Sequence, residues 1–173
     1  QGITARAVVV SAPADVAADL VAPLNAEAAA LFRDIPYAPV ASVFTGFRRD
    51  DVAHPLDGFG FLVPAVENRD ILGTIFSSSL FAGRAPDGSV AVTTFVGGMR
   101  RPELVTREDD ELIDMVMREL ADIIGVRDAP SFTHVFKWKR AIPQYALGHR
   151  RVTDAMDSLE TEYSGLFFCT NYR

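Results

Sequence analysis

The hydrophobic positions in the first part of the chain follow two patterns. A continuous apolar run at Val8–Val10 is typical of a strand that is buried on both faces. From Asp15 to Phe32, apolar residues recur every three or four positions, which predicts a helix, and Pro23 interrupts this stripe. We therefore expect one short strand followed by two helical segments.

Between Tyr37 and Gly98 the pattern changes to short runs of β-branched and aromatic residues separated by Gly, Pro, Asp and Asn. Such runs predict strands, and the strict alternation within the last of them indicates one buried face. No stretch of helical length separates the runs, so we expect an antiparallel meander. The predicted strands are Ala38–Arg48, Gly58–Pro64, Asp70–Ser78 and Ser89–Val96.

The last part of the chain contains the best-defined helix. Thr106 is its expected N-cap, its first turn is acidic, its apolar face runs from Leu112 to Ile124, and Gly125 ends it. The segments expected after it are a strand at Phe132–Trp138, a proline-broken stretch at Arg140–Gly148, a helix about Val152–Tyr163 and a last strand at Gly165–Thr170. Together these elements predict an α+β fold, with an antiparallel or mixed sheet of about five strands and helices packed on it.

Composition narrows the function classes. The chain has 173 residues, 49% of them hydrophobic, and its net charge is −6. Nine acids and three arginines lie between Glu103 and Asp128, which accounts for the whole excess. Nucleic-acid binding needs a basic face, so we expect none. The single cysteine, Cys169, excludes an internal disulfide, and no apolar run approaches the roughly 20 residues of a membrane helix.

A search for catalytic motifs finds none. The three histidines, His54, His134 and His149, lack the spacing of a metal site. Ser77–Ser79 lacks the glycines of a nucleophile elbow, and Gly58–Gly60 lacks the third glycine of a dinucleotide fingerprint. We therefore assign no catalytic residue and no metal ligand.

Apolar side chains beside glycine are the remaining signal. They occur at Phe59–Leu62, at Ile75–Phe76 and at Phe95–Gly98. Glycine within a strand often marks the close approach of a ligand or of another backbone, and large sites for flat ligands are mostly apolar. An ordinary sheet core with bulges explains the same residues, and the pattern alone favours that simpler interpretation.

Two longer motifs are specific: Gly-Phe-Gly-x-Leu-Val-Pro at Gly58–Pro64 and Ile-Pro-Gln-Tyr-x-Leu-Gly-His at Ile142–His149. With several further runs, they resemble one enzyme family, the oxygen-dependent protoporphyrinogen oxidases, which are FAD enzymes of haem biosynthesis related to the amine oxidases. The resemblance extends from Val8 to Arg173. The other matching runs are Ile35–Ala41, Ile71–Gly73 and Phe95–Gly98.

The resemblance implies that the chain is an excised part of a longer enzyme. Residues 1–13 are then an end strand of the FAD domain, residues 14–137 the substrate-binding domain, and residues 138–173 a return segment that stops before the C-terminal cofactor motif. FAD is expected in the full-length enzyme. We do not expect this part to bind FAD or to be active alone.

The resemblance also implies site residues. Phe59, Gly60 and Leu62 match positions against the tetrapyrrole rings, and Ile75 and Phe95 match the apolar lining opposite. No residue inherits the family's propionate-binding arginine, because that arginine belongs to a part of the family that this chain does not match.

Two further aromatic residues match positions at the cofactor. Trp138 corresponds to an aromatic residue near the flavin, and Tyr172 lies at the edge of the expected cofactor segment. Cys169 and Thr170 depart from the family, which usually has Ala-Gly before the Asn at position 171.

The expected partner is a porphyrinogen, and the sequence leaves open whether it is protoporphyrinogen or coproporphyrinogen. A stand-alone module that binds a tetrapyrrole or another hydrophobic ligand is an alternative, and so is a flavin amine oxidase-like enzyme with another substrate, against which the Gly58–Pro64 motif argues. We expect a cytoplasmic location with at most peripheral membrane association, at the inner face of the cell membrane. Homo-oligomerisation stays open.

Overall fold

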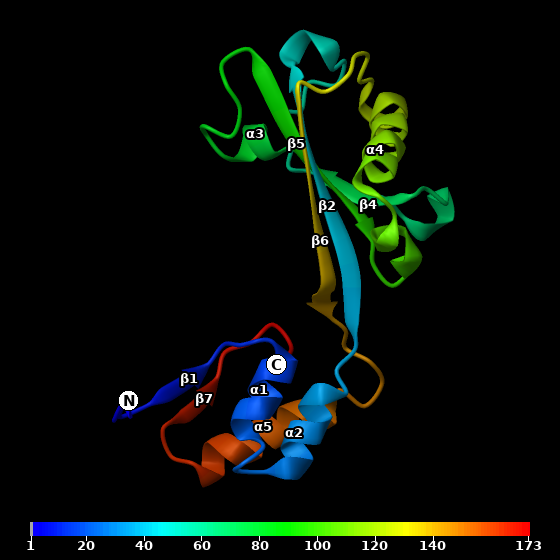
Figure 1. Ribbon diagram of the computed structural model, residues 1–173. Coiled ribbons are helices and arrows are strands. Elements are labelled where there is room, and N and C mark those ends of the chain that lie inside the picture. Colours follow the sequence, from blue (N-terminus) through cyan, green and yellow to red (C-terminus); the bar gives the residue numbers. More distant parts are fainter. Residues whose placement is uncertain (1) are drawn as a thin grey trace. The chain divides into compact units, whose positions relative to one another are not determined.

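The computed structural model describes residues 2–173 and divides the chain into two compact units (Figure 1). We call them the terminal unit, which runs up to Tyr37 and resumes from Pro143 to Arg173, and the sheet unit, Ala38–Ile142. These boundaries differ from the functional segments 1–13, 14–137 and 138–173. The assignment of those segments to parts of a larger enzyme stays a prediction.

The terminal unit joins the two ends of the chain. Strand β1 (Val8–Val10) pairs in parallel with β7 (Leu166–Phe168), a shorter strand than the one predicted from Gly165 to Thr170. The proline-interrupted stripe forms two helices, as predicted, and Asn25 caps the second one by accepting from the Ala28 N–H at 2.9 Å. The helices of this unit are α1 (Ala14–Val21), α2 (Ala26–Arg33) and α5 (Arg150–Glu162).

The sheet unit is built on five strands in the order β3-β4-β5-β2-β6. The predicted α+β class, with one antiparallel sheet and helices packed on it, is confirmed. The strands are β2 (Tyr37–Arg48), β3 (Gly60–Leu62), β4 (Ile71–Ile75), β5 (Ser89–Gly97) and β6 (Phe132–Pro143).

The predicted meander is correct for β3, β4 and β5 but wrong for β2. The long strand β2 pairs with β5 from Val40 opposite Gly97 to Arg48 opposite Ser89. This register gives β2 a partner of nearly its own length, whereas β3 has only three residues in the ladder. In the sheet, β2 therefore lies between β5 and β6 and not beside β3, the next strand in chain order.

Helix α4 (Asp109–Ile124) covers one face of the sheet (Figure 1). The shared core contains, from the sheet, Val43, Phe47, Val92 and Val96 and, from the helix, Leu112, Met115, Val116, Leu120 and Ile124. The predicted N-cap, Thr106, was wrong, because Pro102 begins a 3₁₀ turn that ends at Thr106. Glu108 caps the helix instead, and its N–H donates to the Glu111 carboxylate at 3.3 Å.

Three predicted strand boundaries also change. Strand β4 stops at Ile75, and the residues predicted to continue it form the short helix α3 (Ser77–Leu80). Strand β3 is confined to Gly60–Leu62. Strand β6 continues past Trp138 to Pro143, because its position at the edge of the sheet tolerates a proline without a backbone N–H.

Candidate functional site

The face of the sheet opposite α4 is the candidate site. Strand residues alternate between faces, and Val90, Val92 and Val96 of β5 point into the core beneath α4. Thr93 and Phe95 therefore point to the other side. We call that side the open face, and its residues are Gly60, Leu62, Gly73, Ile75, Thr93 and Phe95 on β3–β5, Phe44 on β2, and Phe132, His134, Phe136 and Trp138 on β6.

The strand register brings four of the predicted substrate residues together. Gly60 lies opposite Ile75, while Leu62 lies opposite Gly73, which in turn lies opposite Phe95. Ile75 and Phe95 are therefore neighbours of Gly60 and Leu62 on one face, and they do not form a facing wall. That these side chains contact a substrate stays a prediction.

Large apolar side chains are exposed along this face. Leu62 is 87% exposed, and Trp138, whose ring centroid lies 4.3 Å from that of Phe136, is 51% exposed. Phe59 lies just before β3, where its carbonyl accepts from the Phe76 N–H at 3.0 Å, and its side chain is 68% exposed. Leu62 lies on one edge strand of the sheet and Trp138 on the other. Exposed apolar side chains of this size are a feature of binding surfaces.

Helix α3 borders the open face where β4 ends. The Ser77 and Thr93 hydroxyls are hydrogen-bonded at 2.8 Å, which holds α3 on the side of the sheet away from α4 (Figure 1). The Ser78 hydroxyl accepts from the Ala91 N–H at 3.0 Å and donates to the Ala91 carbonyl at 3.3 Å. Because β4 ends at Ile75, the Ser78 hydroxyl takes the place of a strand backbone as the hydrogen-bond partner of Ala91.

Close backbone packing explains two of the glycines on the open face. Gly60 has a φ of 143°, and a Cβ there would overlap the Thr74 carbonyl oxygen. A Cβ at Gly73 would overlap the Phe61 carbonyl oxygen in the same way. These two glycines thus allow strands β3 and β4 to approach each other closely. The sequence alone did not distinguish this packing from the approach of a ligand.

Tyr172, matched from the sequence to the cofactor edge, lies in the core of the terminal unit. Its side chain is fully buried, and its hydroxyl donates to the Ala12 carbonyl at 2.9 Å. Burial, together with the nearby Tyr37 and Asp15, raises the pKa of Tyr172 to about 12. This side chain packs against Phe32, and its contact with a cofactor stays a prediction.

The residues between β1 and α1 do not fit the diphosphate of a dinucleotide. Such sites use a glycine-rich turn and free N–H groups at a helix N-terminus. The connection here, 11–13, contains no glycine. The Ala14 N–H is bonded to the Tyr37 hydroxyl at 3.0 Å, and Asp15 adds a negative charge to the first turn.

Two absences are established for residues 2–173. No three side chains of the metal-binding types converge there, and none of the helices is both long and apolar enough to cross a bilayer.

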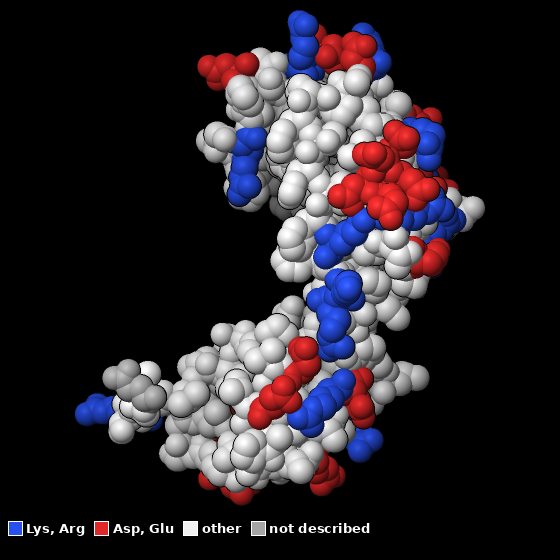
Figure 2. All heavy atoms as spheres, in the orientation of Figure 1, with Lys and Arg blue, Asp and Glu red and all other residues white. Residues whose placement is uncertain are grey.

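Figure 2 shows acidic side chains gathered on the flank of the sheet unit where Figure 1 places α4.

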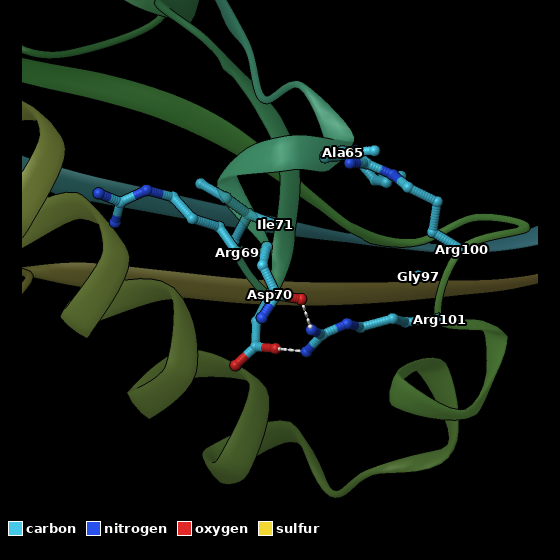
Figure 3. A pocket seen from close by; sticks show the side chains of 9 residues that line it. Ala65, Arg69, Asp70, Ile71, Gly97, Arg100 and Arg101 are labelled. Atoms are coloured by element: carbon cyan, nitrogen blue, oxygen red, sulfur yellow. Dashed lines mark hydrogen bonds and ion pairs between the residues drawn. The ribbon is translucent and has the colours of Figure 1, made fainter.

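Three arginines, Arg69, Arg100 and Arg101, line a hollow at the end of β5 (Figure 3), and acids neutralise two of them. Arg69 pairs with Glu119 at 2.9 Å and with Asp122 at 2.5 Å, and these carboxylates raise its pKa. Arg101 pairs with Asp70. We call this the β4 hollow, lined by Ala65, Asn68, Arg69, Asp70, Ile71, Leu72, Gly97, Arg100 and Arg101.

Comparison with known proteins identifies the family. The model of the family described as flavin containing amine oxidoreductase matches residues 1–173. Among solved structures, a protein from Exiguobacterium sp. 255-15 shares 20% identity and superposes with a TM-score of 0.70, covering 96% of this chain and 36% of that one. At that identity the likeness concerns the fold alone.

Two curated relatives carry names that specify a reaction. The mitochondrial protoporphyrinogen oxidase of Nicotiana tabacum is 38% identical over 143 residues, which cover 81% of this chain and 28% of that protein. Coproporphyrinogen III oxidase of Bacillus subtilis (strain 168) is 26% identical over 169 residues, which cover 96% of this chain and 36% of that protein. The chain spans about a third of the length of these relatives.

Proposed function

Because the chain belongs to the family of flavin containing amine oxidoreductases, we propose that it is the part of a porphyrinogen oxidase that holds the macrocycle. The family implies FAD in the full-length enzyme. The connection between β1 and α1 does not fit the diphosphate, so we propose that other parts of the longer protein bind the cofactor.

The observation that carries this proposal is the open face. It presents Leu62, Phe95 and Trp138 on one side of the sheet, and the short helix α3 borders it. A tetrapyrrole is large, flat and mostly apolar, and exposed aliphatic and aromatic side chains stabilise such a ligand through buried area and ring contacts. The contribution of this chain is then to place the macrocycle and exclude water from it.

The names of the relatives support a porphyrinogen as the substrate over an amine. Both the Nicotiana tabacum and the Bacillus subtilis proteins are named for porphyrinogen oxidation, and the former is the more similar of the two to this chain. We propose protoporphyrinogen or coproporphyrinogen as the substrate. A cytoplasmic location, with peripheral contact to the inner face of the membrane, is part of the proposal and rests on the resemblance alone.

Trp138 provides a direct test, because it is the only tryptophan and lies on the open face. Titration of protoporphyrin IX into the 173-residue chain is expected to quench Trp138 fluorescence with saturation. Leu62→Lys should weaken this binding about tenfold or more, since a charge replaces apolar contact area. Val66→Lys is the matched control, because Val66 is also 87% exposed and lies outside β3.

Equal binding by wild type and Leu62→Lys, or equal loss in the Val66→Lys control, would contradict the proposed face.

A second measurement uses the full-length protein that the complete reading frame encodes. Phe59→Ala in that protein should weaken porphyrin binding by about 1–3 kcal/mol with unchanged FAD content. A complete protein that binds porphyrin but no FAD would favour the alternative of a binding module without catalysis.

A further inference from the structure

A second hollow lies at the start of β5, at the other end of this strand from the β4 hollow. It is bounded by the 3₁₀ turn that follows β2, by α3 and by the loop that leads into β5. We call it the β5 hollow, and its lining consists of Arg49, Pro55, Leu56, Ser78, Ser79 and residues 83–90.

Arg49 is held rigidly in this hollow, yet one of its donors has no partner. Its backbone N–H donates to the Gly88 carbonyl at 2.9 Å, and its Nη2 donates to the carbonyls of Val52 at 2.8 Å and His54 at 2.6 Å. The Nη1 atom is buried and has no hydrogen-bond partner among the described residues. A buried unsatisfied donor is costly, and a charged one more so.

The neighbouring groups add positive charge and hydroxyl donors. Arg84 lies over the Phe81 ring, 5.5 Å from its centroid, and neither Arg84 nor Arg49 forms an ion pair within the described part of the chain. Ser79 and Ser89 also line the hollow. Asp87 is the one acid in the lining, against the two arginines Arg49 and Arg84.

The wall of the hollow is also conformationally constrained. Leu56 is buried and has a φ of 55°, a left-handed conformation that is rare for a bulky side chain. Its N–H donates to His54 Nδ1 at 2.9 Å, which compensates part of this strain. A strained residue beside a fixed guanidinium group indicates a preorganised wall.

Comparison of the two hollows indicates which one has capacity for an anion. In the β4 hollow, two of the three arginines, Arg69 and Arg101, already bind carboxylates of this chain, and Figure 3 shows the Arg101 pair. The third, Arg100, donates to the Val63 carbonyl at 3.0 Å. In the β5 hollow, Arg49 and Arg84 bind no carboxylate among the described residues. Guanidinium groups bind carboxylate and phosphate oxygens through short charge-assisted hydrogen bonds, so an oxyanion is the ligand that this donor set fits.

We propose that the β5 hollow binds a small oxyanion, either a carboxylate or a phosphate, through Arg49 and Arg84. The anion has two potential sources. One is a carboxylate side chain of the porphyrin-type ligand, in which case the site extends the proposed function and rests on it. The other is a free inorganic anion.

The test follows the backbone amides of the 173-residue chain by ¹⁵N–¹H NMR during titration with inorganic phosphate and, separately, acetate at constant ionic strength. Saturable shifts are expected at Ser79, Arg84 and Ser89. The amides of Asn68 and Arg101 in the β4 hollow serve as an internal reference and should not shift.

Substitutions assign the donors. Arg84→Met should weaken phosphate binding about tenfold or more. Arg118→Met on α4 is the charge-matched control and should leave it unchanged, because Arg118 is exposed and outside the hollow. Arg49→Met tests the second donor. Since Arg49 also holds two backbone carbonyls, an unfolded Arg49→Met protein leaves Arg84→Met as the deciding variant.

Absence of saturable shifts at the β5 hollow, or equal weakening by Arg84→Met and Arg118→Met, would overturn the proposal.

Competition between phosphate and a porphyrin identifies the source of the anion. If protoporphyrin IX displaces phosphate and its dimethyl ester does not, the site takes a carboxylate of the macrocycle. If neither displaces it, the site takes a free anion. Phosphate binding without any porphyrin binding would support the hollow while contradicting the proposed function.

Discussion

One cluster of aromatic rings in the terminal unit is buried, whereas another in the sheet unit is half exposed. In the terminal unit, Phe32, Phe168 and Tyr172 are buried, and the centroid of the Phe32 ring lies 5.6 Å from that of Phe168 and 6.4 Å from that of Tyr172. In the sheet unit, Phe136 and Trp138 contact each other on a face that stays half exposed. Helices enclose the first group, whereas α4 covers only one side of the sheet. The same residue types are therefore part of the core in the first cluster and remain exposed in the second.

Individual arginines also differ, although ion pairs such as Arg69–Glu119 occur in the sheet unit as well. In the terminal unit, Arg173 pairs with Asp157 and Glu160, and the Arg173 guanidinium group lowers the pKa of Glu160. In the sheet unit, Arg49 and Arg84 have no carboxylate partner within the described residues. Internal satisfaction of charges stabilises a fold, while unsatisfied groups in a rigid wall favour a ligand.

The strongest test of the contrast compares a buried ring with a half-exposed one. Phe32→Ala should lower the free energy of unfolding by about 3–5 kcal/mol, because it removes a fully buried ring. Phe136→Ala, which changes a side chain that is 47% exposed, should cost less than about 1 kcal/mol. Urea denaturation of both variants checks this, and equal losses would mean that the open face is part of the core.

A second test separates packing from binding at Gly60. Gly60→Ala should destabilise the protein by about 2–3 kcal/mol, because a Cβ there meets the Thr74 carbonyl and the φ is positive. Gly58→Ala is the control, since no atom lies within 4 Å of its Cβ position, and it should stay within about 0.5 kcal/mol of wild type. If Gly60→Ala weakens porphyrin binding and leaves stability unchanged, the close approach at Gly60 is that of the ligand and not that of strand β4.

The smallest expected effect concerns the Tyr172 hydroxyl. At neutral pH, Tyr172→Phe should cost about 1 kcal/mol through loss of the hydrogen bond to Ala12. The folded-state pKa of Tyr172 is about 12, above the ordinary value of 10.0, so its protonated form stabilises the fold below pH 10. That stability is lost as the pH rises from 10 towards 12, because the unfolded state then releases the proton first.

Thermal unfolding across pH 9–12 measures this difference between wild type and Tyr172→Phe. Tyr145→Phe is a suitable control, because the Tyr145 side chain is 64% exposed in the same unit, and the variant should keep the alkaline decline. An identical pH profile for wild type and Tyr172→Phe would show that burial of this hydroxyl does not govern alkaline stability.

Local signals in the sequence predicted most elements. The stripe broken at Pro23 became α1 and α2, and the alternating run from Ser89 became β5. The errors occurred where tertiary contacts overrode a local signal. Thr106 has the side chain of an N-cap but completes a turn begun by Pro102. The predicted strand ended at Trp138, but the strand continues to Pro143. It can do so because an edge strand tolerates a proline.

The candidate site was only partly predictable. Gly60, Leu62, Ile75 and Phe95 came from a resemblance, and the register of β3, β4 and β5 places them on one face. Tyr172 came from the same resemblance, yet its side chain is a core residue of the terminal unit. Arg49 was not singled out at all, since an arginine in a turn gives no sign of where its guanidinium group will be held.

Periodicity, turn residues and specific motifs are local properties of the chain, and they were sufficient to predict the class of fold, most of its elements and the family. The partner of β5, the face of the sheet that stays open and the need for glycine at position 60 became clear from the three-dimensional structure. These features depend on contacts between residues far apart in the chain, such as Gly60 and Ile75, and on the free energy gained when α4 buries one face of the sheet rather than the other.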